Sequence, residues 1–241
     1  MGRESASGLG PVIESLRKIH DTLVAVVPCR NEALSIAAVV DDLHRIGVVD
    51  VVVALDPASS DGTDELARER GATIVRASAS GYDAPCLAAL DHLADRGFSG
   101  WVLFLDAGNK YVMETIGALI DTADPMADIT FGIRDSQWRW HQRIGNTMFR
   151  AAVFLRYRHN LRDVSSIRLA KFDSLRLLEF EDRQFSLPFQ TVLHALARSM
   201  TLKYVPIRCT PTRTGASKVS GQWRNSLKAA EQMGISFFRM R

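Results

Sequence analysis

Residues 23–56, LVAVVPCRNEALSIAAVVDDLHRIGVVDVVVALD, decide the fold class of this chain. They begin with a short apolar run, LVAVVP, which is typical of a strand that is buried on both faces of a sheet. The next residues show helical periodicity up to the glycine stop at Gly47, and a second apolar run, VVDVVVAL, follows. A strand, a helix and a strand at this spacing predict a parallel sheet that is covered by helices on both faces.

The same alternation continues to residue 106 and then becomes less regular. Residues 59–71 predict a second helix that ends at Gly71, and an apolar run, a helix and another apolar run follow it: ATIVRA, YDAPCLAALDHLADRG and WVLFLD. The second half predicts a helix with positive charge, a strand after a loop, a further helix and a last strand: MFRAAVFLRYRH, DVSSIRLAKFDSL, FSLPFQTVLHALARS and TLKYVPIRC. We therefore expect an α/β fold with a mostly parallel central sheet.

The composition fits one large folded domain. Of the 241 residues, 46% are hydrophobic and 24% are charged, which allows a sizeable core. We expect a flexible tail over residues 1–20, an α/β domain over residues 21–220 and a basic amphipathic helix over residues 221–241. The apolar and basic side chains of this last helix fit packing on the sheet domain, a homodimer contact or a peripheral contact with a membrane surface.

Charge and cysteine content exclude several classes of protein. The net charge of +3 is small, so we expect no nucleic-acid partner. The three cysteines lie far apart in the sequence, which argues against disulfides and a zinc site and favours a reducing compartment. The N-terminus lacks the apolar core of a signal peptide, and the longest apolar runs are less than half of the ~20 residues that span a bilayer. These features predict a cytoplasmic protein, either soluble or peripheral to the inner face of the membrane.

Polar side chains follow three of the expected strands. Residues 30–32 are Arg-Asn-Glu, and Asp56 and Asp106 each end an apolar run. The carboxyl ends of parallel strands meet at one edge of the sheet, and ligands collect there. A ligand role is therefore favoured for Asp56 and Asp106 over a turn cap, whereas Glu32 fits a ligand role and a helix N-terminus equally. Asp61 is expected to cap the helix that follows it.

Seven motifs in order carry a family resemblance: VVPCRNEALSIAAVV, LDPASSDGT, SGYDAPCLAAL, LFLDAG, WHQRIGN, RDVSSIRLAKFDSL and RTGASKVSG. Over about residues 23–233 the chain resembles family 2 glycosyltransferases, and most of all the bacterial sugar transferases of the polyprenyl-phosphate (dolichyl-phosphate) type. The resemblance implies a GT-A fold, the nucleotide-diphospho-sugar transferase fold. Residues 21–132 would then bind the nucleotide-sugar donor and residues 133–220 the acceptor.

The resemblance also implies roles for individual residues. Asp56 resembles the acid that reads the base, and Asp106 the first acid of the Asp-x-Asp motif, which holds Mg²⁺ or Mn²⁺. Arg213 and Lys218 match a loop that lies near phosphates. Further positions would contact the nucleotide or its phosphates: Pro28, Asn31, Glu32 and Arg134.

Sugar transfer leaves negative charge on the departing diphosphate, so catalysis needs cations near it. An acceptor that is a lipid phosphate is already ionised and needs no general base. Basic side chains would hold such an acceptor: Arg134, Arg143, Arg168, Arg213 and Lys218. An acceptor hydroxyl would need a base, for which Asp163 is the first candidate and Asp182 the second. The sequence thus predicts an inverting hexosyltransferase with a polyprenyl phosphate or a small molecule as acceptor.

Three motifs on the donor side depart from the family pattern. Pro57 and Ala58 stand where Asp and Gly are common, Asp83 replaces a glycine, and Gly108 replaces the second acid of the metal motif. We hypothesise that Lys110 supplies part of the charge that a metal would bring, so that metal binding is weak. A metal held by Asp106 and phosphates is the alternative. The same departures leave two other functions open: a non-catalytic or repurposed binding module, and a nucleotidyltransferase.

Overall fold

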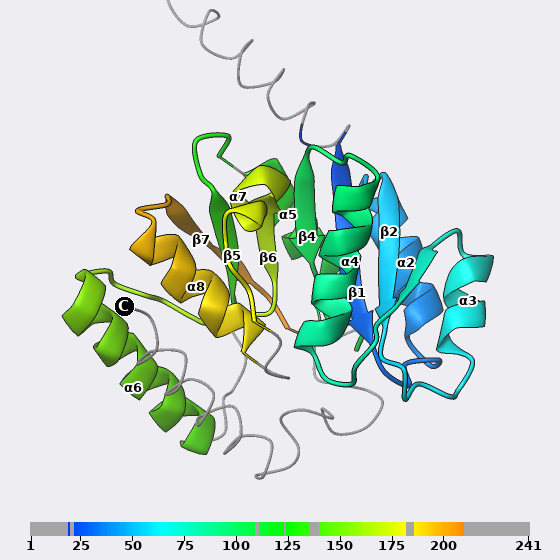
Figure 1. Cartoon of the computed structure of the whole chain (residues 1–241), viewed down its shortest axis with the longest axis horizontal. Helices are drawn as coiled ribbons and strands as arrows, with labels where there is room; N and C mark the ends of the chain where they lie inside the picture. The colour runs from blue at the N-terminus through cyan, green and yellow to red at the C-terminus, as the bar shows by residue number, and fades with distance from the viewer. Residues whose placement is uncertain are drawn as a thin grey trace, which may run out of the picture.

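A computed structural model describes residues 19, 22–108, 111–122, 124–134, 140–181 and 186–209, with only the backbone described for residues 140–145. Within these ranges one sheet has seven strands in the order β3-β2-β1-β4-β6-β5-β7 (Figure 1). The strands are β1 (Leu23–Cys29), β2 (Asp50–Leu55), β3 (Thr73–Arg76), β4 (Trp101–Phe104), β5 (Ile129–Arg134), β6 (Arg168–Lys171) and β7 (Leu202–Ile207). The helices are α2 (Ile36–Arg45), α3 (Thr63–Glu69), α4 (Asp83–Asp95), α5 (Met113–Asp121), α6 (Trp140–Tyr157), α7 (Phe172–Arg176) and α8 (Leu187–Ala197).

The direction of the strands defines one functional edge of the sheet. β1 pairs in parallel with β2 and β4, β2 with β3, and β5 with β7. β6 runs antiparallel to both β4 and β5. As a result β1, β2, β4 and β5 end at the edge where β6 begins, and we call this the carboxyl edge. The predicted strands and their mostly parallel arrangement are confirmed.

Side chains on the two faces of the sheet form two hydrophobic layers. Leu23, Ala25 and Val27 of β1 belong to a layer with α2, α3 and α5, whereas Val24 and Val26 belong to a layer with α4, α6, α7 and α8. Figure 1 shows α4 and α8 in front of the sheet and α2 and α5 behind it. The continuous apolar runs are explained because alternate residues of each strand face opposite, equally buried layers. The predicted covering of both faces is confirmed.

Asp83 joins the two halves of the fold. It is the first residue of α4 and is fully buried. Its carboxylate accepts hydrogen bonds from the amides of Ser186 and Leu187, at 2.8 and 2.9 Å, and from the Ser186 hydroxyl at 2.9 Å. These groups form the start of α8, so the carboxylate caps a helix 103 residues later in the chain. The departure from the family glycine therefore has a structural partner in this chain.

Two predicted segments fall largely outside the described residues, namely the tail at residues 1–20, of which only Ile19 is described, and the basic helix at residues 221–241. In the ranges that are described, no helix is both long enough and apolar enough to cross a membrane.

Candidate active site

The three polar clusters predicted from the strand ends lie at the carboxyl edge. β1 lies between β2 and β4 in the sheet. The Asp56 amide donates to the Cys29 carbonyl at the end of β1, and the Leu105 amide, next to Asp106, donates to Val26. Asp56 and Asp106 therefore follow the two strands that flank β1, while Asn31 and Glu32 follow β1 itself.

Asp56 cross-links two loops of the carboxyl edge. Its side chain is only 2% exposed. Oδ1 accepts hydrogen bonds from the Ala58 amide at 2.8 Å and the Ser80 hydroxyl at 2.9 Å, and Oδ2 accepts one from the Gly81 amide at 2.9 Å. The loop after β2 and the loop before α4 are thus held against each other. A carboxylate can accept about four hydrogen bonds, so Oδ2 retains acceptor capacity for a further donor.

The loop after β1 is fastened to the loop after β2. Asn31 has a positive φ of 53°, which is most accessible to Asn, Asp and Gly. Its amide donates to the Ser59 hydroxyl at 2.9 Å, and its Oδ1 accepts from the Ser60 amide at 2.8 Å. The Glu32 amide donates to the Thr63 hydroxyl at 2.9 Å. These contacts fix the backbone where the resemblance expects the nucleoside, and they engage the side chain of Asn31 in that task.

Asp61 and Glu32 act at helix starts. Oδ1 of Asp61 accepts from the amide of Thr63, the first residue of α3, at 3.2 Å, as predicted for a capping residue. Oδ2 also accepts from the Ala33 amide at 3.0 Å. Burial raises the pKa of Asp61, but the hydrogen bonds from Thr63 and Ala33 together lower it by more, so the resulting pKa is below its ordinary value. The Glu32 carboxylate accepts from the hydroxyl of Ser35, which precedes α2.

Asp106 is held by two hydroxyl groups on one of its oxygens. Oδ2 accepts from the Tyr111 hydroxyl at 3.0 Å and from the Ser166 hydroxyl at 2.7 Å. Burial and the Asp106 charge raise the pKa of Tyr111 well above its ordinary value, so the phenol stays a neutral donor. Oδ1 accepts no hydrogen bond from the part of the chain that the structure describes. One oxygen of the carboxylate is therefore held in place by two hydroxyl groups.

Ser166 was missed by the sequence analysis. It lies in the loop before β6, which runs antiparallel to both of its neighbours. Ser166 therefore reaches the carboxyl edge from the beginning of a strand, whereas the sequence analysis considered only residues that follow the end of a strand. The SSI sequence between Asp163 and the strand is the only local signal of a hydroxyl at the sheet edge.

Arg134 and Asp163 form a buried ion pair at the carboxyl edge. Nε and Nη2 of Arg134 donate to the two oxygens of Asp163 at 3.2 and 3.3 Å, and Nη2 also donates to the Val164 carbonyl at 3.0 Å. The Asp163 side chain is 4% exposed and that of Arg134 is 22% exposed. Burial lowers the pKa of Arg134, but the charges of Asp163, Tyr111 and Asp106 raise it above its ordinary value. Arg134 is thus a fixed cation, and its charge interacts with Asp106.

Arg168 lies beneath the same edge. It is fully buried, and its guanidinium carbon stands 3.9 Å from the centre of the Phe104 ring. Nη1 donates to the Ser166 carbonyl at 3.3 Å, while Nε and Nη2 have no hydrogen-bond partner among the residues that the structure describes. Because no part of the side chain reaches the surface, Arg168 offers no direct contact to an acceptor phosphate. It instead holds the backbone of the serine that binds Asp106.

The metal question rests on Asp106. Among the described residues no group of three or more His, Cys, Asp or Glu side chains is placed to hold a metal ion. Several predicted site residues lie outside the described ranges, or have only their backbone described: Lys110, Arg143, Asp182, Arg213 and Lys218. Within the described ranges the donor set is a single carboxylate, Asp106, whose Oδ1 accepts no hydrogen bond from a described residue. Mg²⁺ is often held by one or two carboxylates plus substrate phosphates, so this set fits a metal that is completed by a diphosphate.

The sequence model of "Glycosyl transferase family 2" matches residues 24–176, which extend from β1 to the end of α7. The chain belongs to glycosyl transferase family 2. The matched region of this family 2 glycosyltransferase contains the site residues described above: Asn31, Asp56, Asp106, Arg134 and Asp163. The match therefore covers all of the site that the structure describes.

Individual relatives agree with this family assignment. An uncharacterized glycosyltransferase of Mycobacterium tuberculosis is 28% identical over 217 residues, which cover 87% of this chain and 94% of that protein. The polyprenol monophosphomannose synthase of Mycolicibacterium smegmatis is 25% identical over 236 residues, covering 91% of this chain and 88% of that protein.

Solved structures identify the fold as GT-A. Glucosyl-3-phosphoglycerate synthase from Mycobacterium tuberculosis, in complex with Mn²⁺, UDP-glucose and phosphoglyceric acid, has a TM-score of 0.74 to this family 2 glycosyltransferase at 16% identity. The similarity covers 98% of this chain and 86% of that chain. The predicted GT-A fold is confirmed, and the protein is a glycosyltransferase.

Proposed function

We propose that this glycosyltransferase moves a hexose from a nucleotide diphosphate to a polyprenyl phosphate, with inversion at the anomeric carbon. The observation that carries the proposal is the Arg134–Asp163 ion pair beside Asp106. It puts a permanent cation at the edge where the donor binds and occupies the carboxylate that a hydroxyl acceptor would need as its base.

The donor half of the proposal rests on Asp106. The Tyr111 and Ser166 hydroxyls hold Oδ2, and Oδ1 accepts no hydrogen bond from the described residues. Oδ1 would ligate Mg²⁺ or Mn²⁺ together with the two phosphates of the donor. A bound metal would supply positive charge to the departing diphosphate. Arg134 adds charge that does not depend on the metal, because the guanidinium stays protonated at every accessible pH.

The acceptor half rests on the state of Asp163. Both of its oxygens accept hydrogen bonds from Arg134, and the side chain is almost fully buried. A carboxylate in this state is a poor general base, because taking a proton would break a buried ion pair. A phosphate acceptor avoids the problem: its ionised oxygen attacks the anomeric carbon directly, and the electron pair of the broken bond leaves with the nucleoside diphosphate. We therefore assign Asp163 to positioning Arg134.

One relative supports the same acceptor class, because it is named a polyprenol monophosphomannose synthase. The solved neighbour instead holds phosphoglyceric acid, which offers a hydroxyl as well as a phosphate. A small phosphate-bearing molecule is the alternative acceptor. The sugar and the base of the donor are left for the assay to identify.

A product assay with purified full-length protein tests the proposal. UDP- and GDP-linked hexoses are incubated with polyprenyl phosphate and Mg²⁺ or Mn²⁺, and the released nucleotide and the glycosylated lipid are both measured. We expect a nucleoside diphosphate and one sugar phosphodiester in equal amounts. Asp106→Asn should lower the rate about 10²-fold, as loss of a group that stabilises transition-state charge does. Asp91→Asn, at an exposed position of α4, is the matched control and should leave the rate unchanged.

Other products would overturn the proposal in distinct ways. Release of pyrophosphate would identify a nucleotidyltransferase. Nucleotide binding without any product, across all donors and both acceptor classes, would identify a binding module. A faster reaction with hydroxyl acceptors than with phosphates, together with loss of that reaction in Asp163→Asn, would restore Asp163 as the base.

A further inference from the structure

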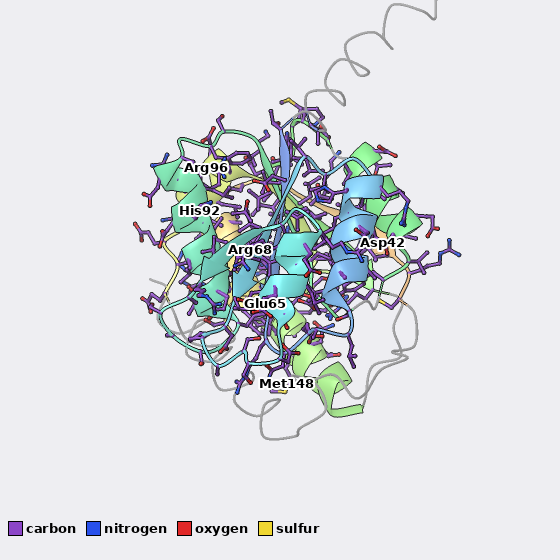
Figure 2. The ribbon with its side chains drawn as sticks, turned by 90° about the vertical axis from the view of Figure 1, so that its right-hand side faces the viewer. Asp42, Glu65, Arg68, His92, Arg96 and Met148 are labelled. Atoms are coloured by element: carbon purple, nitrogen blue, oxygen red, sulfur yellow. The ribbon has the colours of Figure 1, made fainter. Side chains whose placement is uncertain are left out.

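The helix α6 has apolar side chains on two different sides. Phe149 and Val153 are buried, and the Phe149 ring packs edge-on against Phe189 of α8 with ring centroids 5.2 Å apart. Met148, Phe154 and Leu155 are instead 68%, 49% and 71% exposed. Figure 1 shows α6 at the periphery of the molecule beyond α8, and Figure 2 labels Met148 at the lower surface. The packed side explains the helix, whereas the exposed side has no partner in the described part of the chain.

The exposed side of α6 lies in a positively charged segment of the protein. Residues 136–162 contain six arginines and no acidic residue, although the net charge of the whole chain is only +3. The rest of the chain is therefore net negative. Arg156 and Arg158, at the end of α6, and Arg162 shortly after it are exposed. A helix with apolar and cationic side chains exposed together is typical of a surface that binds anionic lipids.

The position of α6 links this face to the carboxyl edge. The chain leaves the sheet at Arg134, the last residue of β5, and it reaches Asp163 after α6 and before it re-enters the sheet at β6. The ion pair between Arg134 and Asp163 joins the two ends of the segment that contains α6. A surface that holds α6 is therefore connected to Arg134, which the proposed function places beside the departing diphosphate.

Charge favours a membrane over a second copy of the chain. A twofold contact would bring the same arginine-rich face of both copies together, and the like charges would repel. Anionic headgroups instead compensate the arginines, and juxtamembrane basic residues each contribute to such binding. We propose that the exposed side chains of α6, namely Met148, Phe154, Leu155 and Arg156, bind the surface of an anionic membrane. The inference rests on the proposed lipid acceptor, which such a surface would present to the carboxyl edge.

Vesicle flotation with the full chain tests this proposal. We expect binding to vesicles of phosphatidylcholine with 30% phosphatidylglycerol, a proportion of the order used to give a negative surface potential, and little binding to phosphatidylcholine alone. Phe154→Ser combined with Leu155→Ser should lower the partition coefficient at least about tenfold, because two apolar side chains no longer insert. Met126→Ser combined with Leu177→Ser is the matched control, since these side chains are 80% and 62% exposed on other elements. The control should bind like the wild type.

The outcomes separate this inference from the proposed function. Equal binding of both double variants, or no preference for phosphatidylglycerol, would refute the membrane face. A dimer by light scattering that is lost only in the α6 variant would make the face an interface between copies instead. Turnover with a water-soluble short-chain prenyl phosphate should be unchanged in the α6 variant, while turnover with acceptor in vesicles falls. If no transfer occurs at all, the proposed function fails, but the flotation result still decides the membrane face.

Discussion

Removal of the Asp83 carboxylate should destabilise the fold more than any other single change at an acidic residue of α4. Asp83→Ala leaves the amides of Ser186 and Leu187 without their acceptor at the buried start of α8. Each unsatisfied buried donor costs about 1–3 kcal/mol, and the hydrogen bonds to a charged acceptor are the stronger kind. With the Ser186 hydroxyl included, we expect the free energy of unfolding to fall by about 3–5 kcal/mol. That is a large share of the stability of a typical domain, which is about 5–15 kcal/mol.

Urea unfolding followed by circular dichroism measures this effect. Asp83→Asn keeps one acceptor oxygen and should lose about half as much stability as Asp83→Ala. Asp91→Ala, at an exposed position of the same helix, should stay within about 0.5 kcal/mol of the wild type. If Asp83→Ala were as stable as Asp91→Ala, the capping of α8 by Asp83 would be wrong. The departure from the family glycine would then again lack a reason.

Three further predictions follow from burial. Burial raises the pKa of Cys86 to about 12, so a thiol reagent at pH 8 should label only the partly exposed Cys209 in the folded protein and all three cysteines after unfolding; rapid native labelling of a second thiol would contradict this. Gly132→Ala would place a Cβ 2.6 Å from Cγ1 of Ile207 and should lower the free energy of unfolding in urea by about 1–3 kcal/mol. An unchanged urea midpoint would show that β5 and β7 can accommodate the added methyl group. Burial lowers the pKa of His159 from its ordinary value, so the unfolded chain binds a proton at this side chain more readily than the folded chain does. The melting temperature should therefore fall as the pH drops below about 6.5, and His159→Asn should reduce that fall. A fall that stayed equally large in His159→Asn would contradict the prediction.

Most of the fold could be predicted because its signals are local. Apolar runs of strand length, helical periodicity and the glycine stops at Gly47 and Gly71 repeat from β1 to β4 at the spacing of parallel strands. The direction of β6 could not be predicted. Strand direction depends on where the chain re-enters the sheet, and the motif DVSSIRLAKFDSL carries no signal of that.

The candidate site divides in the same way. The strand-end rule placed Asp56 and Asp106 correctly at one edge, because it depends only on topology. The partners of these residues were not predictable, because the contacts join segments far apart in the sequence. Ser166 binds Asp106 from 60 residues away, and Arg134 pairs with Asp163 across 29 residues. Asp163 was therefore interpreted as the first candidate base for a hydroxyl acceptor, and both that role and the positioning role that we propose stay predictions.

The hypothesis that Lys110 replaces part of the metal charge stays a prediction, because this residue lies outside the described ranges. Arg134 offers a second source of fixed positive charge near Asp106, which the sequence analysis had assigned only to phosphate binding. A magnesium titration in the presence of nucleotide separates the two sources. Weak metal binding that strengthens in Lys110→Ala but not in Arg134→Lys would support the lysine.

Calorimetric titration of UDP and GDP into the full chain tests most directly whether the carboxyl edge binds a nucleotide-sugar donor. With Mg²⁺ or Mn²⁺ present, we expect one of the two nucleotides to bind at a single site, and Asp106→Asn to weaken that binding about tenfold or more. Asp91→Asn should bind like the wild type. Absence of binding for both nucleotides, or equal affinity in Asp106→Asn and wild type, would contradict the account.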